Sequence, residues 1–363
     1  MSHNVAKRWD IFCRIVDNFG DIGVCWRLSQ QLAQEHHLQV RLFIDDLATA
    51  SHIIPALNCE LTSQVIHHVE ILTWQSADTI HPADVALETF SCELPANYLA
   101  AMQGISTWIN LEYLSAESWV AEFHARSSNN TKPARHFFFP GFTEATGGLI
   151  REANIFQNNQ LIASQQPLGN DTLKVSLFCY PHAPIADLLN AMAESNQRVD
   201  CHVPTSSIFP KIAEFFHLDI IETGSILRKK NLTVHARPFL SQADYDQLLA
   251  SCDINFVRGE DSWIRAIWAG KPFIWQPYLQ TENTHVTKLN AFLDLFYADC
   301  ESHVKAAVYK IHSAWVIGNF TTDIWQNYLD TLNTTKSFTF TKASQLATQN
   351  DLASKLVIFL QKL

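Results

Sequence analysis

The feature that most constrains the fold is a regular alternation of short apolar segments with segments of helical periodicity. The apolar segment 11–16 is followed by a glycine-containing loop, 17–23, and then by apolar residues at helical spacing. Further strands are predicted at 40–44, 67–72 and 85–88, with a helix from residue 47 to 56. This order predicts a parallel sheet that is covered by helices on both faces.

The alternation stops at a polar, turn-rich stretch and then resumes, and we place a boundary between residues 150 and 172. After it, strands are predicted at 174–179, 199–203, 232–236 and 254–257, and helices at 183–193 and 242–252. The 363 residues exceed what one hydrophobic core usually supports. We therefore expect an α/β protein with a first lobe at 1–153 and a second at 172–340. The remaining residues, 341–363, include an amphipathic helix at 352–360 that can return to the first lobe.

The charge is low in density and acidic in sign. Charged residues make up 17% of the chain, and the net charge is −10. This balance argues against binding to nucleic acid or to an anionic membrane, since both require an excess of Lys and Arg. Residues 1–153 hold 17 acidic and 9 basic residues, so the first lobe is expected to receive a basic partner.

Nothing in the sequence indicates export or insertion into a membrane. Residues 1–10 lack the basic and apolar regions of a signal peptide, and no stretch of about 18 uncharged apolar residues occurs. The 8 cysteines show no metal-knuckle or redox spacing, which indicates buried thiols in a reducing cytoplasm. The sequence predicts a cytoplasmic protein.

The loop 17–23 places two carboxylates, Asp17 and Asp21, at the end of the first predicted strand. Open α/β sheets bind ligands at this edge, and Gly20 and Gly23 allow close backbone approach. The spacing differs from the dinucleotide fingerprint, which has three glycines. Two interpretations stay open: Asp21 caps the helix while Asp17 forms a local turn, or the pair takes part in catalysis.

A second group of charged and polar residues, Arg258, Glu260, Asp261 and Ser262, follows the strand 254–257 directly. The arginine can bind a phosphate with two hydrogen bonds, and the N–H groups of the following helix favour the same charge. The acidic pair would repel a phosphate unless one carboxylate turns towards sugar hydroxyls. A helix start alone does not explain the arginine beside an acidic pair, so we favour a functional site.

The sequence also contains an Asp-x-Asp pattern, at Asp244 and Asp246, which resembles the metal-binding pattern of some glycosyltransferases. However, Ser241 stands three residues before Asp244, a spacing typical of a helix cap. We therefore assign no metal site.

Several longer motifs resemble those of the EarP family, the bacterial protein-arginine rhamnosyltransferases that modify elongation factor P. They are residues 17–28, 110–117, 147–152, and 258–262 with 269–273. The resemblance implies a GT-B fold, with two Rossmann-like lobes facing across a cleft. It also implies the donor dTDP-β-L-rhamnose, held mainly by the second lobe, and elongation factor P as acceptor on the first. The implied product is an α-linked rhamnosyl arginine, hence inversion, which activates the factor to rescue ribosomes stalled at polyproline. No metal or other cofactor is expected.

The resemblance also assigns roles to single residues. It implies that Asp21 is the general base, that Asp17 is its companion and that Glu260 contributes to catalysis. The residues that it assigns to the donor are Asn18, Phe19, Gly20, Phe178, Tyr180, Phe239, Leu240, Ser241, Gln242, Arg258, Gly259, Glu260, Asp261, Ser262 and Tyr278. The family pattern at 239–242 is Phe-Val-Pro-Gln, so Ser241 stands where a proline is usual.

Two other functions compete with this interpretation. The first is a GT-B transferase or an epimerase that uses another nucleotide sugar or a small acceptor. The second is a non-catalytic sugar-nucleotide sensor or translation-factor adaptor. The presence of Asp17, Asp21 and Glu260 speaks against the sensor, because a binding protein has no need for a paired base.

Overall fold

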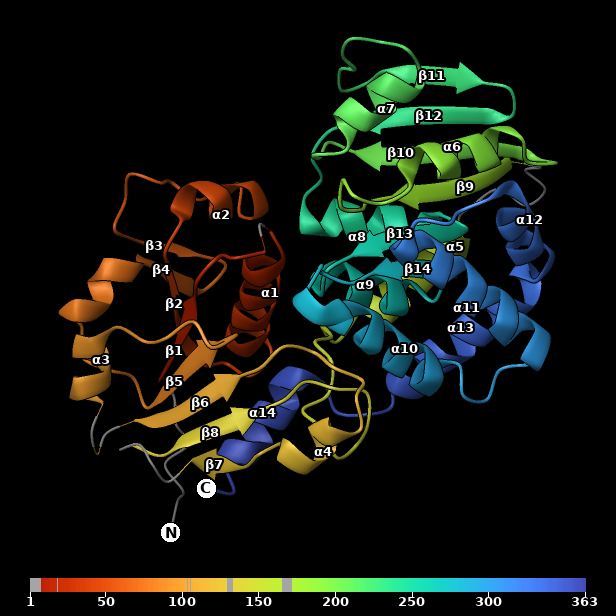
Figure 1. The fold of residues 1–363 in the computed structure, drawn as a ribbon. Coiled ribbons are helices and arrows are strands. Elements are labelled where there is room, and N and C mark those ends of the chain that lie inside the picture. Colours follow the sequence, from red (N-terminus) through yellow and green to blue (C-terminus); the bar gives the residue numbers. More distant parts are fainter. Residues whose placement is uncertain (1–7, 18, 103, 105, 129–132, 165–171) are drawn as a thin grey trace. The chain divides into compact units, whose positions relative to one another are not determined.

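The chain divides into two compact units in the computed structural model, which describes residues 8–17, 19–102, 104, 106–128, 133–164 and 172–363 (Figure 1). Unit 1 comprises Met1–Ala153 and Ala347–Leu363, and unit 2 comprises Asn154–Leu346. The predicted boundary at residue 341 is wrong, because helix α13 runs unbroken from Leu332 to Leu346. The stretch expected to link the lobes contains α5 (Ile155–Ser164), which packs against helices α8 and α9 of unit 2.

Unit 1 contains a sheet in the order β3-β4-β2-β1-β5-β6-β8-β7. The strands are β1 (Arg8–Cys13), β2 (Gln39–Ile44), β3 (Ser63–Ile66), β4 (Val69–Thr73), β5 (Val85–Thr89), β6 (Thr107–Leu111), β7 (Ser127–Ser128) and β8 (Arg135–Phe138). The inner pairs are parallel, whereas β3 and β7 run antiparallel at the two edges. Residues 14–16 follow β1, so the first strand begins and ends earlier than predicted.

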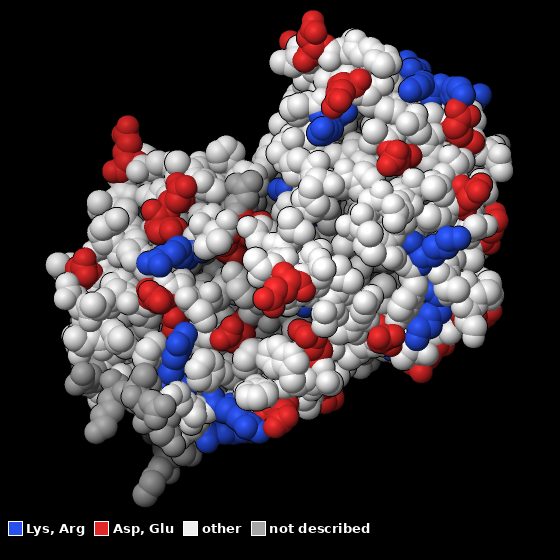
Figure 2. All heavy atoms as spheres, viewed as in Figure 1, with Lys and Arg blue, Asp and Glu red and all other residues white. Residues whose placement is uncertain are grey.

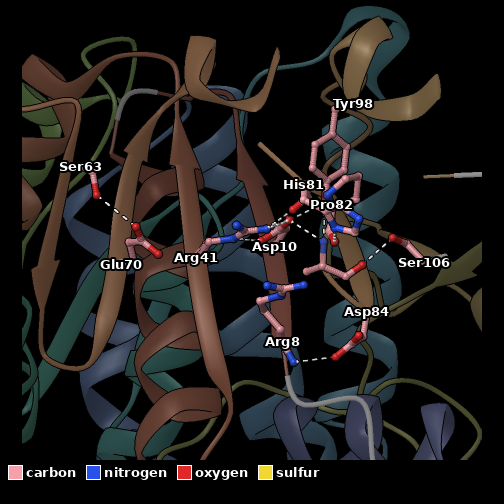
Figure 3. A network of polar contacts seen from close by, with 11 residues as sticks. Arg8, Asp10, Arg41, Ser63, Glu70, His81, Pro82, Asp84, Tyr98 and Ser106 are labelled. Atoms are coloured by element: carbon pink, nitrogen blue, oxygen red, sulfur yellow. Dashed lines mark hydrogen bonds and ion pairs between the residues drawn. The ribbon is translucent and has the colours of Figure 1, made fainter. Parts of the chain in front are cut away.

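Asp10, on the part of β1 that was not predicted, forms a buried ion pair (Figure 3). Asp10 is 0% exposed, and its carboxylate accepts hydrogen bonds from Arg41 Nε (2.6 Å) and Nη2 (2.7 Å) of β2. It also accepts from the Ala83 N–H (3.0 Å) and the Tyr98 hydroxyl (2.5 Å). A buried carboxylate is tolerated when it is fully hydrogen-bonded, and this one joins β1, β2 and the loop before β5. The network lies towards the amino ends of the strands, opposite the edge where the loop 17–23 emerges.

The helices of unit 1 include one from the far end of the chain. They are α1 (Gly20–Gln34), α2 (Leu47–Ile53), α3 (Ala96–Ala101), α4 (Trp119–Phe123) and α14 (Leu352–Leu360), with the 3₁₀ turn η1 (Trp74–Asp78). The Leu352 N–H donates to the Leu149 carbonyl (2.9 Å), and Gln31 Nε2 of α1 donates to Asp351 Oδ1 (3.0 Å). The expected return of the C-terminal helix to the first lobe is confirmed.

Unit 2 contains a six-stranded sheet in the order β11-β12-β10-β9-β13-β14. Its strands are β9 (Thr172–Leu177), β10 (Arg198–Pro204), β11 (Ile226–Lys229), β12 (Leu232–Arg237), β13 (Ile254–Arg258) and β14 (Phe273–Gln276). Its other helices are α6 (Ile185–Ala193), α7 (Phe209–Phe215), α8 (Gln242–Ser251), α9 (Asp261–Ala269), α10 (Thr284–Phe296), α11 (Ser302–Ile317) and α12 (Thr322–Asp330), with the 3₁₀ turn η2 (Thr281–Asn283). All strand pairs are parallel except β11 with β12. Two Rossmann-like units confirm the predicted α/β fold class.

Charged side chains are sparse on the surface. Figure 2 shows Lys and Arg in small separate groups among Asp and Glu on the face in view. Within the described ranges, none of the helices combines the length and the apolar character that crossing a bilayer requires.

Candidate active site

The Asp21 carboxylate holds the loop that precedes its own helix. Asp21 lies in the first turn of α1 and is 3% exposed. Its Oδ2 atom accepts hydrogen bonds from the N–H groups of Val16 (2.8 Å) and Asp17 (2.8 Å). The N-cap position belongs to Phe19, whose side chain forms no cap. The interpretation of Asp21 as a helix cap is therefore wrong, because its carboxylate bonds backwards to the loop instead of to the helix.

The loop is compact and brings further carboxylates close to Asp21. The Gly20 N–H donates to the Asp17 carbonyl (2.7 Å), and a Cβ at Gly20 would lie 3.0 Å from Asp17 Oδ2. Asp45, directly after β2, accepts from the Ile15 N–H through Oδ1 (3.0 Å). Asn18, which was also predicted to belong to this site, lies outside the described residues. A side chain at position 20 would therefore press on the Asp17 carboxylate.

Burial and like charges perturb the proton affinity of Asp21. Burial raises the pKa of its carboxyl, and the nearby carboxylates of Asp17 and Asp45 raise it further. The two backbone N–H groups oppose this shift because they stabilise the ionised form. A carboxylate with a raised pKa is a stronger base, which suits proton transfer near neutral pH.

In unit 2, Arg258 lies between two aromatic rings at the carboxyl edge of the sheet. It is the last residue of β13, and its guanidinium carbon lies 4.4 Å from the ring centroid of Phe178 and 4.6 Å from that of Tyr180. Its Nη1 donates to the Cys179 carbonyl (3.4 Å). The structure thus brings together three residues that the resemblance assigned to the donor, since β9 and β13 are neighbouring parallel strands.

The turn after Arg258 prepares the start of α9. Gly259 has φ = 61°, its N–H donates to the Gln276 carbonyl (3.1 Å), and its own carbonyl accepts from Trp275 Nε1 (2.7 Å). Ser262 Oγ accepts from the Arg258 N–H (3.0 Å) and donates to the Arg258 carbonyl. Glu260 occupies the N-cap position of α9 without a side-chain cap. The N–H groups in the first turn of α9 carry partial positive charge, and they lie at the same carboxyl edge of the sheet as Arg258.

Tyr278 and two residues that the sequence analysis missed extend this site. Gln276 is 1% exposed, its Oε1 accepts from the Tyr180 N–H (2.8 Å), and its Nε2 lies 3.0 Å from His182 Nε2. The His182 ring stacks on Tyr180 at 5.7 Å, and burial lowers the pKa of His182, which favours the neutral ring. Tyr278 is 47% exposed and meets Tyr180 edge to face at 5.8 Å. A polar residue that ends a buried strand, as Gln276 does, is the signal that could have revealed this contact.

The segment 239–242 lies at the same edge, after β12, and does not form a metal site. Ser241 Oγ accepts from the Asp244 N–H (3.1 Å) and donates to Asp244 Oδ2 (2.7 Å), so Ser241 caps α8 as the sequence predicted. Asp246 is paired with the buried Arg265 through Oδ1 (2.9 Å) and Oδ2 (2.7 Å). Among the described residues, no group of three or more His, Cys, Asp or Glu side chains lies together in a way that could hold a metal ion. Phe239 is 36% exposed.

Unit 1 also contains an acidic pair that sequence reasoning left without a role. Glu88, at 1% exposure, accepts from Trp108 Nε1 (2.9 Å) and pairs with Arg135 Nη2 (3.0 Å). Glu112 follows β6, and burial raises the pKa of its carboxyl while Arg135 opposes the shift. Glu88 lies near the end of β5 and Glu112 directly follows β6. Because these strands are parallel to β1, both carboxylates lie at the carboxyl edge of the sheet, which also holds Asp21.

Two Rossmann-like units, each with a predominantly parallel sheet covered by helices, are the architecture of the GT-B fold. Solved structures of this fold include MurG of Acinetobacter baumannii (TM-score 0.53, 11% identity, 98% of this chain and 99% of that chain). A UGT transferase from Siraitia grosvenorii in complex with UDP gives a TM-score of 0.56 at 10% identity, over 98% and 99% of the two chains. At such identities the likeness concerns the fold alone.

Closer similarities identify the family. The family model for the elongation-factor P (EF-P) rhamnosyltransferase EarP matches residues 9–361. A protein-arginine rhamnosyltransferase of Pseudomonas putida is 39% identical over 97% of this chain and 98% of its own length. A structure that explains EarP-mediated arginine glycosylation of translation elongation factor EF-P is 30% identical, with a TM-score of 0.71 over 98% of this chain and 99% of that chain. The chain belongs to the EarP family, as its motifs indicated, and it is a glycosyltransferase.

Proposed function

We propose that this enzyme transfers L-rhamnose from dTDP-β-L-rhamnose to an arginine side chain of elongation factor P in the cytoplasm. The relatives named protein-arginine rhamnosyltransferase support the sugar and the acceptor residue, and the EF-P glycosylation structure supports the acceptor protein. The observation that carries the donor site is the Arg258 guanidinium, held between Phe178 and Tyr180 at the carboxyl edge of unit 2. The product is an α-linked rhamnosyl arginine, which activates the factor for rescue of ribosomes stalled at polyproline.

Each part of the donor has a counterpart in unit 2. Arg258 and the N–H groups at the start of α9 bind the diphosphate, because both present positive charge at one strand end. Glu260 and Asp261 bind sugar hydroxyls, so their carboxylates are turned away from the phosphate and do not repel it. The exposed ring of Phe239 and the segment that ends in the Ser241 cap contact the thymine, while Tyr278 contacts the phosphate side.

The acceptor nitrogen poses the main chemical difficulty. A guanidinium has a pKa above about 12, so complete deprotonation in advance at neutral pH would cost about 7 to 9 kcal/mol. We infer that an Nη atom attacks C1 of the rhamnose while the bond from C1 to the diphosphate oxygen breaks with its electron pair. The attacking nitrogen loses one proton to Asp21 as the new bond forms, and Asp17 helps to orient the guanidinium. The C–N bond forms on the face opposite the leaving group, which inverts the anomeric centre.

The leaving dTDP needs its growing negative charge stabilised. We infer that Arg258 and the first turn of α9 supply this stabilisation, and hydrogen bonds to Gln276 and Trp275 hold the Gly259 turn that joins them. We therefore propose that the reaction needs no metal ion. Chelation of divalent metals should leave the rate of transfer unchanged.

Mass spectrometry of the acceptor tests the proposed function. The purified enzyme is incubated with EF-P and dTDP-rhamnose, and peptides are searched for one added deoxyhexose on arginine. An EF-P variant with Lys at the modified position and reactions with UDP-sugars are the controls. Modification that requires dTDP-rhamnose and the arginine supports the proposal. Transfer from another nucleotide sugar, or binding of the donor without turnover, would instead favour a different transferase or a sensor.

A further inference from the structure

His182 of unit 2 has a hydrogen-bond partner that determines which of its ring nitrogens carries a proton. His182 lies in the loop between β9 and α6, and the residue is exposed. Its Nε2 atom lies 3.0 Å from Nε2 of Gln276, the last residue of β14. The orientation of the Gln276 amide therefore decides the tautomer of the histidine ring.

Tyr180 fixes the orientation of that amide. The Tyr180 N–H donates to Gln276 Oε1 (2.8 Å), so the amide oxygen faces this backbone group and the NH₂ group faces His182. The opposite orientation would bring the NH₂ group against the Tyr180 N–H, and two donors would then face each other. Gln276 is 1% exposed, so water does not compete for either contact. The NH₂ group donates to His182 Nε2, which must be unprotonated to accept.

The histidine ring is held neutral, with its proton on Nδ1. A neutral imidazole has one N–H, and an unprotonated Nε2 leaves it on Nδ1. A proton on Nε2 would point at the Gln276 NH₂ group, so this contact opposes the charged ring. Partial burial lowers the pKa of His182, and the neighbouring His285 of α10 lowers it further. His182 thus presents one uncharged N–H donor.

Gln276 also joins His182 to the turn that follows Arg258. The Gln276 carbonyl accepts from the Gly259 N–H (3.1 Å), in the turn between β13 and α9. The Tyr180 ring stacks on His182 at 5.7 Å, and the Arg258 guanidinium carbon lies 4.6 Å from the centroid of the same ring. His182, Arg258 and the start of α9 therefore form one group of donors at the carboxyl edge of the sheet.

These donors suit a ligand group that only accepts hydrogen bonds. The guanidinium of Arg258, the N–H groups of a helix start and the Nδ1–H of His182 can donate but cannot accept. A phosphate oxygen accepts without donating, whereas a sugar hydroxyl also needs an acceptor, and the carboxylates of Glu260 and Asp261 are the acceptors in this turn. An uncharged donor also avoids the repulsion that a second cation would meet beside Arg258.

We propose that His182, held in its Nδ1–H form by Gln276, donates a hydrogen bond to an oxygen of the donor diphosphate. The inference deepens the proposed function and rests on it. Gln276 is a positioning residue, because it acts on the ligand only through His182. The ring keeps its proton throughout the reaction, so it binds the leaving diphosphate without protonating it.

Three substitutions of His182 separate the position of the N–H donor from the size of the side chain. His182→Asn keeps an N–H close to the position of Nδ1, His182→Gln places its N–H groups close to the position of Nε2, and His182→Ala has neither. His303→Ala is the matched control, because His303 is also an exposed histidine of unit 2, on α11. Calorimetry measures the affinity of each full-length variant for dTDP, and circular dichroism checks that each is folded.

We expect His182→Ala and His182→Gln to bind dTDP about 5- to 30-fold more weakly, because each loses one hydrogen bond to a charged oxygen at an exposed site. His182→Asn should stay within about threefold of the parent, since it keeps the donor. The control should match the parent protein. Equal dTDP affinities of the asparagine and alanine variants would overturn the inference.

Nuclear magnetic resonance of ¹⁵N-labelled histidine reads the tautomer directly. The chemical shifts of the ring nitrogens should show a proton on Nδ1 of His182 and none on Nε2 in the parent protein at neutral pH. Gln276→Glu replaces the NH₂ donor by a carboxylate oxygen, so His182 should then carry a proton on Nε2. A proton on Nε2 in the parent would contradict the role of Gln276 and overturn the inference.

Failure of the inference can be distinguished from failure of the proposed function. If the parent binds dTDP but transfers no rhamnose to EF-P, the proposed function fails, while the dTDP affinities of the variants still decide the role of His182. If the parent does not bind dTDP, both fail.

Discussion

Replacement of Arg258 by lysine tests the donor site of unit 2 most sharply, because it keeps the positive charge and changes only its shape. The guanidinium lies 4.4 Å from the Phe178 ring and 4.6 Å from the Tyr180 ring. Its planar fork can donate two parallel hydrogen bonds to a phosphate, whereas an ammonium acts as a point charge. Arg258→Lys therefore removes one charge-assisted hydrogen bond and most of the ring stacking.

The expected loss follows from these two contributions. A hydrogen bond to a charged group contributes about 1.5 to 3 kcal/mol, and a cation–π contact at a partly exposed site about 0.5 to 1 kcal/mol. Lysine regains part of the ring contact, and Arg258 is only half-buried, so we expect a net loss of about 2 to 3 kcal/mol. That loss corresponds to a dTDP affinity weakened about 30- to 150-fold.

Calorimetric titration of the full-length enzyme with dTDP measures this affinity directly. Arg198→Lys is the matched control. Arg198 is exposed at the start of β10, so it lies at the amino ends of the parallel strands of this sheet, whereas Arg258 lies at their carboxyl ends. The control should bind dTDP as the parent does. A dTDP affinity of Arg258→Lys within threefold of the parent would refute the assignment of Arg258 to the diphosphate.

Three further predictions concern unit 1. The pKa of Asp21 is raised, and the carboxylate must be ionised to act as the base. We therefore expect kcat/KM to fall as the pH drops through the raised pKa. A value of kcat/KM that stays constant down to about pH 4 would contradict the assignment of Asp21 as the base. Asp10→Asn leaves the buried Arg41 charge without its ion-pair partner. Urea unfolding should therefore show that the free energy of unfolding of unit 1 falls by about 3 to 5 kcal/mol. A fall below about 1 kcal/mol would be inconsistent with a stabilising role of this network. Gly20→Ala should preserve the midpoint of thermal unfolding, since alanine favours a helix. Turnover should fall about tenfold, because the new Cβ contacts the Asp17 carboxylate. Unchanged turnover would show that this contact does not disturb the site.

Periodicity and strand-end position predicted much of the fold and part of the site. Strand-end position singled out Arg258, whereas Phe178 was assigned to the donor only through the resemblance to the EarP family. The structure brings the two together, because residues after neighbouring parallel strands meet at one edge; Arg258 and its hydrogen-bond partner Cys179 are 79 residues apart. The start of β1 was missed because Asp10 looks unsuitable for a buried strand until Arg41 is placed beside it. The sequence pattern left both possibilities for Asp21 open, because the direction of its carboxylate depends on the path of the preceding loop.

Contacts between segments that are far apart in the chain could not be predicted from the sequence. The pair of Gln276 and His182 spans 94 residues, and no local pattern links the two side chains. The helices between Thr284 and Leu346 were not predicted, and their continuity moved the end of unit 2 past residue 341. The short edge strands β3 and β7 were also missed, since four and two residues give too little alternation to recognise.

The proton acceptor in unit 1 is the central claim, and Asp21→Asn tests it most directly. Asparagine can accept the same hydrogen bonds from Val16 and Asp17 but cannot take a proton. Because the folded state raises the pKa of Asp21, the protonated carboxyl contributes stability below its ordinary pKa, and this contribution is lost as the pH rises through the raised value. At neutral pH the variant should therefore be no less stable than the parent.

The decisive measurement is single-turnover transfer of rhamnose to EF-P by Asp21→Asn, with the affinities for EF-P and dTDP measured on the same preparation. We predict that the rate falls by about 10² to 10⁴, with dTDP affinity unchanged and EF-P still bound. A rate close to that of the parent, with both substrates bound normally, would contradict the assignment of Asp21 as the base.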